Sequence, residues 1–130
     1  MPSNDLSSFF SEHRITDEDC ILFFSVSNPH IITPKLCSAE GYDFMLAKFF
    51  DNSDDEYHGL IKINQRLFGN QNRFVAIGRI EGDDIICIDS ANNTYHLWLT
   101  DQSAPSLLHI ADSFKELLMK TVAQIDGMVI

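Results

Sequence analysis

The sequence predicts an α+β fold in which an antiparallel β-sheet packs against α-helices. Short apolar runs separated by turn residues fill the stretch from Phe74 to Leu99, which is typical of a β-meander. Apolar residues recur at three- and four-residue spacing near both ends of the chain, which is typical of amphipathic helices. A length of 130 residues with 45% hydrophobic content is ample for one core. We therefore expect a single domain covering residues 1–130.

Three strands and two turns make up the predicted meander. Phe74–Ile77 is a short apolar run, and Asp84–Ile88 is too short and too β-branched for a buried helix. The segment Glu81–Asp84 supplies the turn residues between these strands. Asn92–Asn93 tolerates positive φ, so it can close a tight connection before the aromatic run Tyr95–Leu99.

Two short helices are expected in the N-terminal part. Apolar residues at helical spacing predict an amphipathic helix over Leu6–Arg14. A second helix is predicted over Cys20–Phe24, with Thr16 at its N-cap and Asp19 in the carboxylate position of a capping box. Asn28–Pro29 is expected to end it. The early carboxylates are therefore interpreted as helix-start residues rather than as a binding site.

The middle of the chain mixes extended and ambiguous segments. His30–Leu36 suggests an edge strand that Pro34 terminates. Aromatic residues and alternation predict a strand over Tyr42–Phe50. The pattern of Leu60–Phe68 permits either a helix or a strand, and Gly69–Asn72 is expected to be a loop.

The C-terminal part ends in a predicted helix. Periodicity alone permits a helix from Ser106 onward, but Ser113 to Glu116 is a capping-box pattern that places its start later. Gly127 is expected to stop this helix.

Four segments, taken in order, resemble the SUKH superfamily, which is named after yeast cell-wall regulators and consists mostly of bacterial immunity proteins. They are Ala76–Gly78, Gly82–Asp89, Leu97–Trp98 and Ile110–Phe114. The match covers about the C-terminal half, while the N-terminal half departs from the family pattern. The resemblance implies an antiparallel sheet packed on helices, a helix rather than a strand at residues 60–68, and extended chain until about residue 112.

Composition restricts the classes of partner and compartment. Nineteen acidic and nine basic side chains give a formal net charge of −10, which argues against nucleic acid and favours a basic protein partner. We expect no membrane span and no signal peptide, and therefore a cytoplasmic protein that is a monomer or a weak homodimer. Three cysteines without a close pair suit a reducing compartment.

Motifs for cofactor, metal or catalytic chemistry are weak. The segment Asp51–Lys62 begins like a calcium loop but lacks the glycine and the final glutamate that such a loop requires. The five histidines are scattered, and no phosphate-binding motif is present, so we expect no metal, no cofactor and no catalytic residue. Cys20 and Cys87 are interpreted as core residues, and Cys37 as the most exposed of the three thiols.

Two further side chains have competing interpretations. Trp98 on its strand is expected to belong to the core or to the wall of a sheet rather than to a ligand-stacking site. Asp89 closes its strand, and its carboxylate is expected either to hold its own backbone in an Asx-turn or to contact a partner.

The remaining candidates are acidic side chains on two loops that the meander can bring to one side of the protein. The predicted partner-binding residues are Asp51, Asp54, Asp55, Glu56, Glu81, Asp83 and Asp84. Composition alone favours two solvated loops that keep the protein in solution. The resemblance instead implies an immunity protein whose acidic face competes for the basic surface of a toxin, which in this family is often a nuclease.

Three hypotheses of function follow. The first is a non-catalytic immunity protein that binds and neutralises a cognate toxin domain. The second is a regulatory or scaffolding interaction domain of the same fold, as the cell-wall regulators imply. The third is a small hydrolase that uses a cysteine and a histidine, which the residue inventory disfavours.

Overall fold

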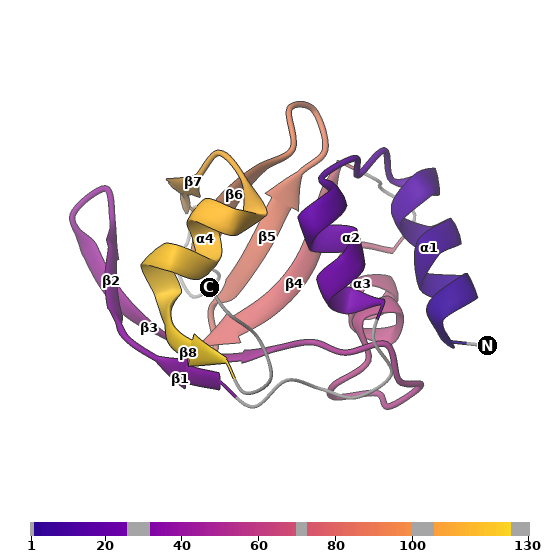
Figure 1. Cartoon of the computed structure of the whole chain (residues 1–130), viewed down its shortest axis with the longest axis horizontal. Helices are drawn as coiled ribbons and strands as arrows, with labels where there is room; N and C mark the ends of the chain where they lie inside the picture. Colours follow the sequence, from indigo (N-terminus) through magenta and orange to yellow (C-terminus); the bar gives the residue numbers. More distant parts are fainter. Residues whose placement is uncertain (1, 26–31, 70–72, 100–105, 126–130) are drawn as a thin grey trace.

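The computed structural model describes residues 2–25, 32–69, 73–99 and 106–125, and has the predicted α+β fold (Figure 1). In chain order its elements are α1 (Pro2–Glu12), α2 (Glu18–Phe24), β1 (Ile32–Pro34), β2 (Leu36–Ala39), β3 (Tyr42–Phe49), α3 (Leu60–Phe68), β4 (Phe74–Ile80), β5 (Ile85–Asp89), β6 (Thr94–Leu99), β7 (Ser106–Ala111), α4 (Phe114–Thr121) and β8 (Val122–Ile125).

The main sheet has six strands in the order β2-β3-β4-β5-β6-β7, and each strand is antiparallel to its neighbours. Strands β4 to β6 form the predicted meander, and β7 extends it. The two edge strands also approach each other, because the Glu40 carboxylate after β2 accepts a hydrogen bond of 2.7 Å from the backbone N–H of His109 in β7. Strands β1 and β8 form a separate antiparallel pair.

The two faces of the main sheet are covered differently. Helices α2 and α4 lie across one face, which we call the inner face, and α3 lies on the opposite, outer face (Figure 1). Phe114 of α4 is the centre of the inner packing: its ring centroid lies 5.0 Å from that of Phe23, 5.9 Å from that of Phe49 and 5.9 Å from that of Tyr95. Burial of these aromatic rings supplies much of the apolar area that stabilises the fold.

A buried amide joins α3 to the outer face. The Asn64 side-chain NH2 donates to the carbonyl oxygens of Leu60 and Ala76, both at 2.8 Å, and its Oδ1 accepts from the Ala76 N–H at 2.7 Å. These bonds satisfy the backbone of β4 where a bulge interrupts its pairing with β5 between Ala76 and Gly78. Gly78 is required there, because a Cβ atom would lie 2.9 Å from the carbonyl oxygen of Lys48.

One carboxylate joins the N-terminal helices to the sheet and to α4. Asp17 Oδ2 accepts 2.8 Å hydrogen bonds from the Tyr95 hydroxyl in β6 and from the Phe114 N–H that opens α4. Its Oδ1 accepts from the Cys20 N–H at 3.4 Å, which makes Asp17 the N-cap of α2. Burial, together with Cys20 and Asp17, raises the pKa of Tyr95, so its hydroxyl stays protonated and remains a donor.

Several boundaries differ from those predicted. The N-cap of α2 is Asp17, and Thr16 instead donates its N–H to Asn93 Oδ1 at 2.7 Å. Ser113 caps α4 as predicted, accepting from the Glu116 N–H at 3.1 Å. The prediction that Gly127 stops this helix is wrong, because α4 ends at Thr121 and the chain pairs with β1 as β8.

The other predicted helices, strands and loops have three kinds of outcome. Strand β3 occurs where it was expected, α1 overlaps the expected helix but begins at Pro2 and ends at Glu12, and residues 60–68 form a helix. The extended segment before Leu36 contains β1, but β2 was not predicted. The expected features at Asn28–Pro29, in most of Gly69–Asn72 and beyond residue 125 lie outside the described residues.

We predict that Asp17→Ala lowers the free energy of unfolding by about 2–4 kcal/mol, because it removes an N-cap and leaves the Tyr95 hydroxyl and the Phe114 N–H without their acceptor. Asp19→Ala is the matched control, since Asp19 is exposed in the first turn of the same helix. Urea denaturation measures both variants. Equal midpoints for the two variants would contradict the role assigned to Asp17.

Candidate functional site

The turn between β4 and β5 holds two acidic side chains on a fixed backbone. Glu81 and Asp83 are exposed, and the turn is closed by hydrogen bonds from Ile80 N to Asp84 O at 2.9 Å and from Asp83 N to Ile80 O at 3.0 Å. Glu81 N also donates to Met45 O at 2.9 Å, which ties the turn to β3. The carboxylates are therefore presented on rigid backbone, which lowers the conformational entropy lost on docking.

Asp84 does not share this exposure, which corrects the sequence prediction. Its carbonyl pairs with the N–H of Ile80, so Asp84 is part of the hairpin ladder rather than of the turn tip. The residue is 6% exposed and is counted among the buried polar residues. We call the exposed pair Glu81 and Asp83 the acidic turn.

The acidic residues of the second loop mostly stabilise the loop itself. Asp51 Oδ1 accepts from the Ser53 N–H at 3.0 Å, and Asp55 Oδ1 accepts from the N–H groups of Tyr57 and His58 at 2.7 and 3.0 Å. Asp54 lies 3.6 Å from the Lys62 ammonium. Glu56 is exposed, and its backbone oxygen accepts from the Arg66 guanidinium.

The structure separates these two loops along β3. The acidic turn is bonded to Met45, in the middle of β3, whereas the second loop begins after Phe50, whose N–H donates to Ile77 O at 2.9 Å. Five residues of extended chain separate Met45 from Phe50, which corresponds to about 17 Å. The seven predicted residues therefore divide into two exposed carboxylates on the acidic turn, a buried Asp84, and a separate loop.

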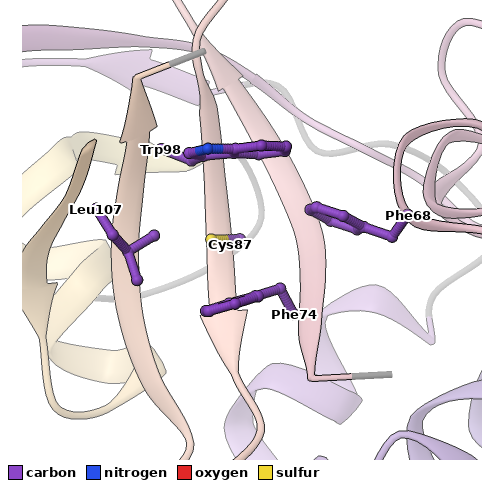
Figure 2. Close-up of a pocket in the computed structure, with 5 residues that line it drawn as sticks. All are labelled: Phe68, Phe74, Cys87, Trp98 and Leu107. Atoms are coloured by element: carbon purple, nitrogen blue, oxygen red, sulfur yellow. The ribbon is translucent and has the colours of Figure 1, made fainter. Parts of the chain in front are cut away.

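Beside the acidic turn, the outer face contains an apolar pocket that the sequence reasoning missed. Its volume is about 240 Å³, and Figure 2 shows the rings of Trp98 and Phe74 on either side of Cys87, with Phe68 of α3 and Leu107 of β7 at the flanks. We call this the outer-face pocket. Trp98 stacks on Phe68 with ring centroids 5.1 Å apart and an interplanar angle of 24°.

The pocket follows from strand register. Cys87 is directly opposite Ala76 of β4, and both residues are fully buried. Because both side chains are small, they leave a depression at the centre of the outer face. Trp98 is opposite Leu107 and Ile85, and the larger side chains therefore form walls around this centre. The sequence signal for this face was the alternation of residues along β6, which places Thr94, His96 and Trp98 on the same side of the sheet. The sequence does not show where small residues on neighbouring strands meet, so it did not predict the pocket.

Charge is absent at the floor of the pocket and balanced at its Phe74 end. Burial raises the pKa of the Cys87 thiol to about 12, so the floor is neutral. Arg73 donates two hydrogen bonds to Asp89, at 3.2 and 3.1 Å, and this guanidinium holds the pKa of the Asp89 carboxyl below its usual value. Asp89 also accepts from the Ala91 N–H at 3.0 Å, which is the predicted Asx-turn.

The pocket lies next to the acidic turn along β5. Ile85 is the first residue of β5 after the turn and is the cross-strand partner of Trp98. Cys87 at the pocket floor is only three residues beyond Asp84, which corresponds to about 10 Å of strand. The interpretation of Trp98 as the wall of a sheet agrees with this position, on the face opposite the aromatic core.

All three cysteines are free and buried. Burial raises the pKa of the Cys20 and Cys37 thiols as well as that of Cys87. Cys37 is 7% exposed, so it is the most exposed of the three, as expected, without being a surface residue. At Cys37 the charges of Lys120 and Lys35 oppose the effect of burial, but the pKa is still raised, so none of the three thiols has the lowered pKa of a cysteine nucleophile.

We predict that the folded protein reacts slowly with a disulfide reagent at pH 7.5, because its thiols are buried and protonated. In 6 M guanidinium the same three thiols should react fully within minutes. Absorbance of the released thiolate measures both rates. Rapid reaction of Cys20 or Cys87 in the folded protein would contradict the burial described above.

Within the described ranges, no three histidine, cysteine, aspartate or glutamate side chains gather as a metal site. Among those same residues, no helix has the length and apolarity needed to cross a membrane. No family model, no curated protein and no solved structure matches this chain.

Proposed function

We propose that this chain is a non-catalytic binding protein, specifically an immunity protein that binds and neutralises a cognate toxin domain with a basic surface. The observation that carries the proposal is the acidic turn. Glu81 and Asp83 are exposed on a hairpin that is hydrogen-bonded to β3, in a chain whose net charge is −10. Such a turn can steer a basic partner and bind it without rearrangement.

Two further features support this proposal. An antiparallel sheet packed on helices is the architecture that a resemblance to the SUKH superfamily implies. The buried, protonated thiols disfavour the alternative of a cysteine hydrolase. Free cysteines also suit action in the cytoplasm, where a toxin with an intracellular target must be neutralised.

The most direct test of the proposal is genetic. If this chain is an immunity protein, we expect the gene for its toxin to lie beside its own, with the toxic domain at the C-terminus of the product. That C-terminal domain is expressed in bacteria, with and without this chain. We expect growth arrest by the domain alone and normal growth when both are present. A toxic domain that this chain does not neutralise, or a harmless neighbour, would favour the regulatory or scaffolding alternative instead.

We predict that Glu81→Lys with Asp83→Lys slows association with that toxin domain by about ten-fold or more at low salt, because reversing the charges replaces attraction by repulsion. Raising the salt concentration should slow the parent protein in the same direction. Stability should change little, since both side chains are exposed. Stopped-flow association measures the rates.

The matched control is Asp54→Lys with Glu56→Lys, which makes the same change of charge on the separate loop. Both double variants are compared at 0.1 M salt, where attraction between exposed charges is screened within about 10 Å, and there we expect this control to keep most of the parent association rate. Equal slowing by the two double variants would show that net charge, and not the acidic turn, governs association.

A further inference from the structure

We propose that the outer-face pocket is an anchor site for one aromatic or branched aliphatic side chain of the basic partner. This inference rests on the proposed function and adds to it the apolar part of the interface. The acidic turn would bring the partner to this face, and the pocket would hold it there.

The size and lining of the pocket define the chemistry of its occupant. A volume of about 240 Å³ is below the range of about 300–1,000 Å³ that is usual for small-molecule sites. It exceeds the roughly 150 Å³ cavity that accommodates benzene in an engineered protein. Two phenylalanines, a tryptophan, a leucine and a protonated cysteine line it, so the occupant is an uncharged apolar group the size of a single side chain.

The arrangement of the walls favours a flat or branched group. The rings of Trp98 and Phe74 stand on either side of the Cys87 floor (Figure 2). Aromatic rings in pockets of this kind accept the aromatic anchors that contribute most to binding at protein interfaces. Leu107, at 38% exposure, forms the accessible rim on the β7 side.

The charged residues near the pocket indicate which residues should lie next to the anchoring side chain in the partner's sequence. Exposed Glu81 and Asp83 lie beyond the Trp98 end of the pocket, because Trp98 is opposite the first residue of β5. Arg73, the guanidinium beside Phe74, has its charge balanced by Asp89. Lysine or arginine next to the anchoring side chain therefore complements this face, whereas acidic neighbours would be repelled.

Trp98 provides a direct readout, because it is the only tryptophan of the chain. Three capped tripeptides serve as probes: Lys-Phe-Lys, Glu-Phe-Glu and Lys-Gly-Lys. Trp98 fluorescence, excited at about 295 nm, is followed during titration of each peptide. We expect saturable binding of Lys-Phe-Lys in the millimolar range, at least about five-fold weaker binding of Glu-Phe-Glu, and no saturation with Lys-Gly-Lys.

Leu107→Arg tests the location of the site, because it places a cation at the pocket rim on a half-exposed position and should not unfold the protein. Leu22→Arg is the matched control, since Leu22 is 73% exposed on α2, which covers the inner face. We expect Leu107→Arg to abolish binding of Lys-Phe-Lys and Leu22→Arg to leave it unchanged, with both denaturation midpoints near that of the parent.

Three results would overturn the inference: no saturable change with Lys-Phe-Lys, equal binding of Glu-Phe-Glu, or equal effects of the two arginine variants. Its failure can be separated from that of the proposed function. If Leu107→Arg associates normally with the toxin domain while reversal of the acidic turn slows association, the pocket is not the anchor but the proposed function stands. If the peptides bind as expected but no toxin is neutralised, the pocket stands and the proposed function fails.

Discussion

The hydrogen bonds accepted by Asp17 join three elements of the inner layer, α2, β6 and α4. Its carboxylate holds the start of α2, the Tyr95 hydroxyl of β6 and the first N–H of α4. These contacts span 78 and 97 residues of sequence, so they close long loops and fix both inner-face helices against the sheet. Helices α2 and α4 therefore cover the inner face, whereas α3 and the pocket beside it lie on the outer face.

In the proposed interface, the acidic turn of the outer face steers the partner and the outer-face pocket anchors it. The acidic turn is held by backbone hydrogen bonds at the junction of β4 and β5, and the strand that follows it leads directly to the Cys87 floor of the pocket. Electrostatic attraction acts over about a Debye length and mainly raises association rates, whereas apolar burial mainly slows dissociation. The proposed mode of binding therefore uses two features on adjacent parts of one sheet, and neither requires a catalytic group.

Local patterns predicted most of the elements, because helix caps and strand periodicity act over a few residues. Ser113 is one example, since its hydroxyl caps α4 through the nearby Glu116 N–H. The predictions that failed concern features that depend on contacts between residues far apart in the sequence. Thr16 and Asp17 are both good caps in sequence, and only the bonds to Tyr95 and Phe114 select Asp17. The register of the β4–β5 hairpin likewise buries Asp84, and the pairing of small residues across strands creates the pocket. Both depend on how strands pair, which the sequence of one strand does not show.

The central claim is that a protein partner docks on the outer face beside the acidic turn. Methyl NMR of the isotope-labelled protein tests it most directly, with the C-terminal domain encoded by the neighbouring gene as the added component, provided that this domain proves toxic. Leu107 lies at the pocket rim and Ile85 beside the turn, whereas Leu22 and Met119 are exposed on α2 and α4. The account predicts that the methyl signals of Leu107 and Ile85 shift on binding and those of Leu22 and Met119 do not. The reverse pattern would place the interface on the helical side and contradict it.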